Sequence, residues 1–273
     1  MNKSYVYPSI ELLDKENGGE LPLAKITYKK DLANKLLVPI GMDEKKEKYY
    51  MDFHSVPVLF ISGTTGSGKS IFIDSLLVSL LLKNSPEDIN FMFFDPKQVE
   101  LGEYKDIPHI INGSDNNQLK VDSLSYMIEY RLNLFKENHV KNIEEYQSIE
   151  KMSHVFAVID ESIDVMEIEK TKEVINMILE HGNNTGIHLV IATNGYLKKD
   201  FEKRFLSRIP YILTYELASE EESKYIKVEG ANLLCEEGEG LIRSRDNTIY
   251  KINTPYISDK EIDTVVNFIK NNN

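Results

Sequence analysis

The chain has 273 residues, of which 41% are hydrophobic and 28% charged, so it is long enough for one large core or for a main domain with a smaller one attached. A formal net charge of -12 at pH 7 argues against a protein that coats nucleic acid with its whole surface, but it does not exclude a local basic site. The N-terminus lacks a continuous apolar core and no apolar run reaches the roughly 18 residues of a membrane span, so we expect a cytoplasmic chain with no direct membrane insertion.

The first 50 residues carry the weakest pattern. Gly18 and Gly19 lie in a polar stretch that predicts a loop, and residues 36–53 predict two short strands joined by a charged turn. We therefore expect residues 1–50 to form an N-terminal segment with short strands that packs on a main domain of residues 51–273.

From residue 56 onward, short apolar runs alternate with helical patterns. The runs at residues 56–62, 89–95, 154–160 and 187–193 predict buried strands. Apolar residues spaced by three and four predict helices over residues 70–83, 119–138 and 169–182, the last with Gly182 as its C-cap. Ser219 with Glu222 and Ser258 with Glu261 have the spacing of capping boxes and predict two further helix starts. This alternation predicts an α/β fold, a mainly parallel sheet covered by helices on both faces.

The sequence GTTGSGKS follows the first of these strands, and a helical pattern begins directly after it. In this spacing, backbone N–H groups turn around phosphate oxygens, the lysine reaches the β and γ phosphates, and the final hydroxyl holds Mg²⁺. We therefore predict a site for ATP and Mg²⁺ rather than a merely structural glycine turn. Its nucleotide-binding residues are Gly63, Thr64, Thr65, Gly66, Ser67, Gly68, Lys69, Ser70 and Ile71.

An acidic pair ends the third strand. Asp160 would lie at the carboxyl end of the strand, where its carboxylate can hold the water shell of the magnesium ion together with Ser70. Glu161 would orient and deprotonate the attacking water. An acidic strand end is common without any such role, so this prediction depends on the P-loop that precedes it. The predicted catalytic residues so far are Lys69, Asp160 and Glu161.

The fourth strand ends in Thr193 and Asn194. In P-loop ATPases with a catalytic glutamate after the acidic strand, an extra strand usually lies between that strand and the phosphate-loop strand, and we assign residues 188–194 to this position. Asn194 would then act as a catalytic sensor of the γ-phosphate; the alternative is a turn closed with Gly195. Five Lys and Arg residues between Gly195 and Arg208 predict a strip that contacts DNA phosphates, with a solvated helix face as the alternative.

Taken together, these motifs resemble the motor domain of the FtsK/SpoIIIE DNA translocases. The matching stretches are GTTGSGKS, FFDPKQVEL, YKDIPHI, VIDE, TGIHLVIAT, GANLLCEEGEGLI and YISDKEIDTVVNFIK, in this order over roughly residues 36–270. The resemblance implies a RecA-like motor that forms a homo-oligomeric ring, usually a hexamer, and pulls double-stranded DNA through its centre. By position it also implies that Asp95 and Lys97 lie near the nucleotide, although Pro96 fixing a strand exit explains the same residues.

Two departures from the family pattern concern the coupling of hydrolysis to movement. The family typically has ATQRP where this chain has ATNGY, so Asn194 replaces a glutamine and is one methylene shorter. The family often has an arginine just before GIHL, where this chain has Asn183 and Asn184. Arg204 and Arg208 are the nearest substitutes for an arginine that reaches the phosphate of a neighbouring subunit, or they contact DNA.

The P-loop and the acidic pair predict an ATPase, and the resemblance implies an ATP-dependent double-stranded DNA translocase that acts as a ring. We expect it to serve DNA transfer by a mobile element or phage. We also expect a partner protein that provides DNA loading or membrane attachment. One alternative is a conjugative coupling or secretion-type ring ATPase, and another is an ATP-binding adaptor that hydrolyses weakly.

Overall fold

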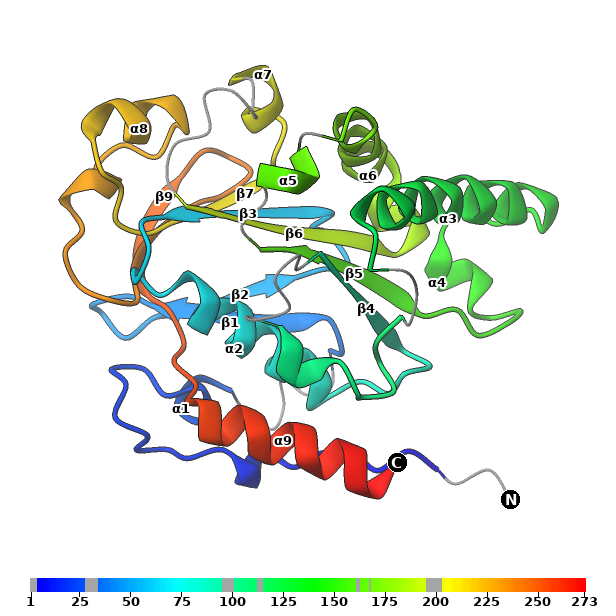
Figure 1. Ribbon diagram of the computed structural model, residues 1–273, viewed down its shortest axis with the longest axis horizontal. Helices are drawn as coiled ribbons and strands as arrows, with labels where there is room; N and C mark the ends of the chain where they lie inside the picture. The colour runs from blue at the N-terminus through cyan, green and yellow to red at the C-terminus, as the bar shows by residue number, and fades with distance from the viewer. Residues whose placement is uncertain are drawn as a thin grey trace.

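The computed structural model describes residues 4–27, 34–94, 101–111, 115–160, 163–166, 168–194 and 203–273. Within these ranges the strands form one nine-stranded sheet in the order β2-β1-β9-β8-β7-β3-β6-β5-β4 (Figure 1). The strands are β1 (Leu37–Met42), β2 (Lys48–Asp52), β3 (Val58–Gly63), β4 (Ile89–Phe94), β5 (His154–Ile159), β6 (Ile187–Asn194), β7 (Tyr211–Thr214), β8 (Glu239–Arg243) and β9 (Ile249–Asn253).

The sheet has a parallel half and an antiparallel half. Strands β7, β3, β6, β5 and β4 pair in parallel, whereas β8, β9, β1 and β2 continue the sheet by antiparallel pairing. The predicted sheet is confirmed, and all four predicted strands belong to its parallel half. The antiparallel half comes from two hairpins, one near each end of the chain.

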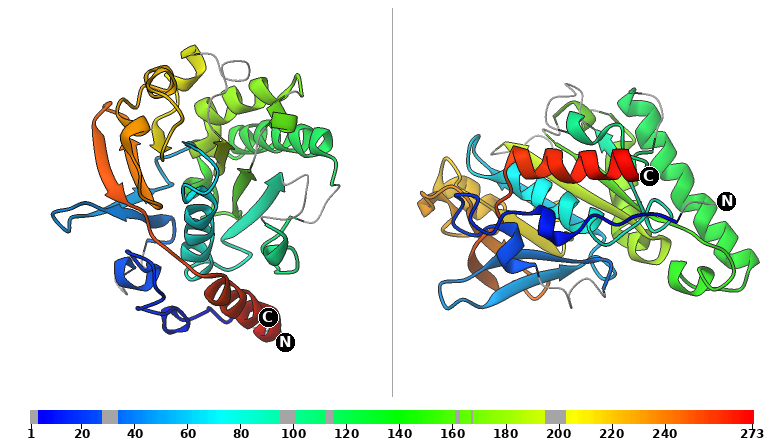
Figure 2. Two further views of the ribbon diagram at one scale, coloured as in Figure 1. Left: turned by 60° about the vertical axis from the view of Figure 1, so that its left-hand side comes forward. Right: turned by 90° about the horizontal axis from the view of Figure 1, so that it is seen from below.

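Helices cover both faces of the sheet, with α2 and α9 on one face and α3 and α6 on the other (Figures 1 and 2). The α-helices are α1 (Leu23–Ile26), α2 (Lys69–Leu81), α3 (Asn117–Glu137), α4 (Ile143–Tyr146), α5 (Ile163–Met166), α6 (Thr171–Thr185), α7 (Lys203–Leu206), α8 (Glu220–Tyr225) and α9 (Asp259–Asn272). Short 3₁₀ turns lie at Ile10–Leu12, Gly102–Tyr104 and Ala231–Leu233. Among the described helices, none combines the length and the apolar character that a bilayer crossing requires.

The apolar character of β3 follows from these two layers. Leu59 and Ile61 join the core on the α2 side, whereas Val58 and Phe60 join the core on the side of α3 and α6. Because successive side chains of a strand point to opposite faces, a strand covered on both faces is apolar at every position.

The predicted end of the third helix is wrong. Helix α6 continues through Gly182 to Thr185, and its C-cap is Gly186, which has a left-handed φ of 66°. Gly182 serves close packing instead, since a Cβ there would lie 2.5 Å from the carbonyl oxygen of Ile187. Both positions require glycine for different reasons, so the pattern of apolar residues alone did not distinguish them.

The N-terminal residues are joined to the C-terminal part of the chain. The predicted hairpin is present as β1 and β2, and β1 meets β9 where Met42 pairs with Asn253. Upstream of the hairpin, the Leu23 N–H donates to Tyr256 O and the Tyr256 N–H donates to Leu21 O, both at 2.8 Å. Strand β2 crosses the predicted boundary after residue 50, and the division into residues 1–50 and 51–273 stays a prediction.

Candidate nucleotide-binding site

The P-loop connects β3 to α2 at the carboxyl edge of the parallel strands. Gly66 and Gly68 have φ angles of 80° and 107°, a region that residues with side chains rarely adopt. A Cβ on Gly68 would also lie 3.0 Å from the backbone nitrogen of Gly238, so the loop packs closely against the segment before β8. The glycines of the motif are therefore required by the backbone that the loop adopts.

Lys69 is the first residue of α2, directly after this loop, and is 6% exposed. Its Nζ donates to the carbonyl oxygens of Gly63 at 2.9 Å and Thr64 at 2.7 Å. The first turn of α2 carries no acidic residue, so the positive end of the helix dipole is not neutralised there. A buried ammonium beside a helix N-terminus is suited to bind an anion such as a phosphate chain.

Other polar groups of the loop suit a nucleotide with a metal ion. The Ser67 hydroxyl is buried and, among the described residues, its oxygen has no hydrogen-bond partner, which leaves it able to donate to a phosphate oxygen. Ser70 is half-buried in the first turn of α2 and offers a hydroxyl oxygen. Together with the carboxylate of Asp160 it supplies the oxygen donors that Mg²⁺ prefers, so the residues present fit this ion.

Strand β6 lies between β3 and β5, as predicted from the sequence. In the register of the sheet, Gly63 of the P-loop is opposite Asn194 at the tip of β6. Asp160 follows directly on β5 at the same edge and is 7% exposed, whereas Asn194 is exposed. The structure thus brings Lys69, Asp160 and Asn194 to one edge of the sheet.

Several predicted residues lie outside the described residues, namely Glu161, Asp95, Lys97 and Gly195, and so does the side chain of Arg204. Arg208 is described, and it lies at the amino edge of the sheet, between α7 and the start of β7. Its Nη2 donates to Glu180 Oε1 at 3.0 Å, and it lines a groove of about 250 Å³ together with Arg243 and Arg245. Arg208 is therefore at the opposite edge from its own P-loop.

Sequence reasoning missed a groove of about 240 Å³ beside the P-loop. Gly68 and Ile71 form one side of it, and the rest is lined by residues 18–21, 237, 238 and 253–256. The ring of Tyr256 covers Gly19, where a Cβ would lie 2.3 Å from Tyr256 Cγ. Gly18 and Gly19 were the only signal of this contact in the sequence, and they predicted no more than a loop.

Several known proteins are similar in sequence to this chain. The pattern of the FtsK/SpoIIIE family matches residues 24–155. A protein named DNA translocase FtsK from Campylobacter jejuni subsp. jejuni is 32% identical over 256 residues, which is 88% of this chain and 27% of that protein. The DNA translocase FtsK of Clostridium tetani is also 32% identical, over 88% of this chain and 34% of its own length. The chain thus spans about a third or less of these relatives.

Two solved structures have a similar fold. The conjugation coupling protein TcpA of pCW3, solved with ATPγS, has a TM-score of 0.76 at 22% identity and is matched over 91% of this chain and 73% of that one. The cytoplasmic domain of the type VII secretion ATPase EccC from Thermomonospora curvata has a TM-score of 0.71 at 20% identity, over 86% of this chain and 31% of that one. These likenesses confirm the predicted RecA-like P-loop fold. The family pattern matched over residues 24–155 and the FtsK relatives at 32% identity confirm the predicted resemblance of this chain to the FtsK/SpoIIIE family.

Proposed function

We propose that this chain is an ATP-hydrolysing motor that moves double-stranded DNA and works as a ring. The observation that carries the proposal is the P-loop, in which buried Lys69 and two glycines with positive φ lie at the same sheet edge as Asp160. Relatives named DNA translocase FtsK, at 32% identity, support DNA as the substrate. Transfer of DNA by a mobile element or phage, with a partner for loading or membrane attachment, stays a prediction from the sequence.

In this proposal the triphosphate of ATP lies along the P-loop. Lys69 Nζ would exchange its two carbonyl acceptors for oxygens of the β and γ phosphates, and the Ser67 hydroxyl would donate to the same chain. The groove beside Gly68 would hold the nucleoside, with Ile71 and Tyr256 as its apolar walls. The N-terminal residues 18–21 would then form part of the ATP site.

Ser70 and Asp160 would hold Mg²⁺ in this site. When bound, the ion would supply positive charge that neutralises the charge developing during phosphoryl transfer. Glu161, next in the chain to Asp160, would orient the attacking water and accept its proton. Asn194, opposite Gly63 at the end of β6, would form a hydrogen bond that depends on the state of the γ-phosphate.

The ring is supported by the position of Arg208. Because this side chain lies at the amino edge of the sheet, it is remote from the P-loop of its own subunit. In a head-to-tail ring, the surface that carries one edge of a subunit can face the nucleotide of the next. We therefore assign Arg208 to the neighbouring subunit's phosphate, where an arginine stabilises transition-state charge.

Steady-state ATP hydrolysis with and without duplex DNA tests the proposal. We expect duplex DNA to raise the turnover of the wild-type chain at least about tenfold, and Lys69→Ala and Glu161→Gln each to lower it at least about 100-fold. Lys224→Ala is the matched lysine control, since Lys224 is exposed on α8 and pairs only with Glu220 among the described residues. If duplex DNA left the turnover unchanged, the result would contradict a DNA-moving motor and favour an ATP-binding adaptor. Stimulation by single-stranded DNA alone would favour a coupling-type ATPase.

A further inference from the structure

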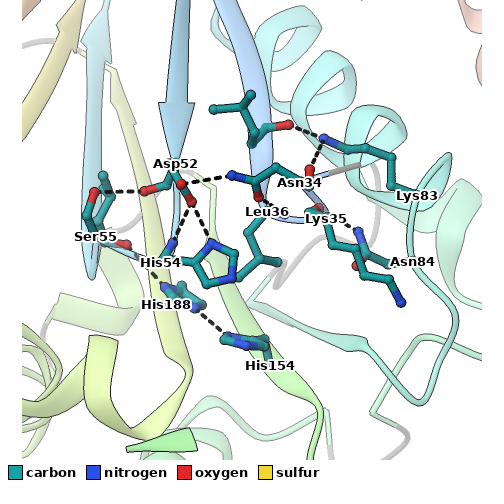
Figure 3. Close-up of polar contacts among 12 residues, drawn as sticks. Asn34, Lys35, Leu36, Asp52, His54, Ser55, Lys83, Asn84, His154 and His188 are labelled. Carbon is teal, nitrogen blue, oxygen red and sulfur yellow. Dashed lines mark hydrogen bonds and ion pairs between the residues drawn. The ribbon is translucent and has the colours of Figure 1, made fainter. Parts of the chain in front are cut away.

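Three histidines, His54, His154 and His188, lie near one another (Figure 3). They are at the amino edge of the sheet, opposite the P-loop. His54 follows β2, His154 is the first residue of β5 and His188 is the second residue of β6. His154 and His188 are 5% and 0% exposed, whereas the side chain of His54 is 40% exposed. Glu144, in the first turn of α4, is exposed beside them. Nothing in the proposed ATP chemistry uses these side chains.

The hydrogen bonds of the two buried rings determine which nitrogens carry protons. His188 Nδ1 lies 3.1 Å from the carbonyl oxygen of Val56, which only accepts, so this nitrogen carries the proton. His188 Nε2 is then the acceptor for His154 Nδ1 at 3.1 Å. His154 Nδ1 therefore carries a proton, and the lone pair of His154 is on Nε2. This is the form in which histidine binds a metal ion.

His54 is oriented by a carboxylate. Its Nδ1 donates to Asp52 Oδ1 at 2.7 Å, so its lone pair is also on Nε2. Asp52 is held in turn by the side chain of Asn34 at 2.9 Å and by the backbone N–H of His54 at 3.0 Å (Figure 3). A carboxylate that orients the second nitrogen of a histidine is the usual support of a metal ligand.

The ligand atoms of His54, Glu144 and His154 all lie within 4.8 Å of one another. In a tetrahedral zinc site with bonds of about 2.0–2.1 Å, ligand atoms are about 3.3 Å apart, so the three groups must close by at most about 1.5 Å. His54 and Glu144 are exposed and can move by rotation of their side chains, while His154 is fixed by His188. The site therefore needs side-chain adjustment but no change of fold.

We propose that His54, Glu144 and His154 bind one Zn²⁺ ion, with water as the fourth ligand. Two imidazoles and one carboxylate favour zinc over magnesium, which prefers oxygen ligands. Buried Arg131, which donates to the carbonyls of Thr185 and Ser153 nearby, opposes a cation, but Glu144 and Asp52 provide two negative charges against it. The ion would join the β2–β3 connection to α4 and β5 at the edge away from the nucleotide.

The test is titration of the untagged, chelator-treated chain with ZnCl₂ by calorimetry, followed by thermal unfolding with and without zinc. We expect one ion per chain with micromolar or tighter affinity and a higher Tm with zinc. Co²⁺ in place of zinc should give the visible absorption of a tetrahedral site. His54→Ala and Glu144→Gln should each weaken binding at least about tenfold, and Asp52→Asn should weaken it about 10- to 100-fold.

The controls are His181→Ala and Glu137→Gln, which change the same residue types outside the cluster. Both should bind zinc like the wild type. Because His54 and Glu144 are exposed, their variants should fold, and circular dichroism of the apo forms checks this. Absence of one-to-one binding by the wild type overturns the proposal. So does binding that His54→Ala and Glu144→Gln leave unchanged, because the zinc would then be bound elsewhere.

Discussion

Asn194 is the residue at which this chain departs from the FtsK/SpoIIIE pattern at the proposed ATP site. It is exposed at the tip of β6 and lies in register with Gly63 of the P-loop. Its amide can donate to a phosphate and accept from a water, but it is one methylene shorter than the glutamine of the family pattern. Its hydrogen bond should therefore matter for coupling more than for ATP binding.

We expect Asn194→Ala to lower the DNA-stimulated kcat about tenfold or more and to change the KM for ATP by less than about twofold. A group that acts only as the bond breaks affects kcat without affecting ground-state binding. Initial rates over a range of ATP concentrations provide both constants. Asn184→Ala, at an exposed position of α6, is the matched control. A raised KM with an unchanged kcat would assign Asn194 to binding instead.

We expect His109 to make the stability of the fold depend on pH. Its ring is 0% exposed and packs edge-on against Tyr5, with ring centroids 5.5 Å apart. Nε2 donates to the carbonyl oxygen of Asn84 at 3.0 Å, and Nδ1 has no hydrogen-bond partner among the described residues. Burial lowers the pKa of His109 to about 4, because a proton on Nδ1 would place a charge in these surroundings.

Between about pH 6.5 and 4 the unfolded chain binds this proton and the folded chain does not, so the free energy of unfolding falls as the pH falls. His109 contributes about 3 kcal/mol to the free energy of unfolding. This contribution is fully present above pH 6.5 and is lost by pH 4. Urea unfolding at pH 7 and pH 5 should show a smaller loss in His109→Gln than in the wild type, whereas exposed His139→Gln should match the wild type. Equal losses in all three would contradict this assignment.

At the scale of elements, α9 is joined to the N-terminal segment by one carboxylate. Glu261 is 4% exposed and has the capping-box contact predicted from the sequence, accepting from the Ser258 N–H at 2.9 Å. It also accepts from the Asp14 N–H at 2.8 Å and from Asn17 Nδ2 at 2.7 Å. These two further bonds join segments that lie side by side near the two chain ends (Figure 2).

Glu261→Ala would leave four donors without their acceptor, namely the N–H and the hydroxyl of Ser258, the Asp14 N–H and Asn17 Nδ2. We expect it to lower the free energy of unfolding by about 2–4 kcal/mol. Glu261→Gln retains one acceptor oxygen and should lose less. Urea denaturation measures both, with Asp263→Ala, exposed on the same helix, as the control within about 0.5 kcal/mol of wild type. If Glu261→Ala lowered the free energy of unfolding no more than this control does, the carboxylate would not hold the two segments together.

The elements that the sequence predicted correctly carry strong local signals. Strands β3, β5 and β6 are apolar at nearly every position because helices cover both of their faces. The P-loop is recognisable in the sequence because the local backbone requires glycine at positions with positive φ. The groove formed by residues 18–21 and 253–256, and the cluster of His54 with His154, depend on contacts between distant segments. No spacing along the chain encodes such contacts, so sequence reasoning missed both.

Across the whole molecule, we propose that the carboxyl edge of the sheet binds ATP and that the amino edge contacts the neighbouring subunit. The carboxyl edge carries Lys69, Asp160 and Asn194, and the amino edge carries Arg208. A ring that sets the amino edge of one subunit against the nucleotide of the next would complete each site with a residue in trans. The trans role of Arg208 can be separated from a structural one by mixing variants.

We expect Arg208→Ala alone to lower DNA-stimulated hydrolysis at least about tenfold, because an arginine in trans stabilises transition-state charge. Mixing it with Lys69→Ala should restore part of the activity, since mixed rings place an intact P-loop beside an intact Arg208. Glu180→Ala, which removes the ion-pair partner of Arg208, controls for loss of that contact. Failure of the two inactive variants to complement each other would contradict an action across subunits.

If ATP hydrolysis drives movement along duplex DNA, as we propose, the moving protein should displace the third strand of a DNA triplex. We expect the wild-type chain to release the third strand only when ATP and Mg²⁺ are present, and Lys69→Ala to release none. Hydrolysis stimulated by duplex DNA but without any ATP-dependent release of the third strand would contradict it.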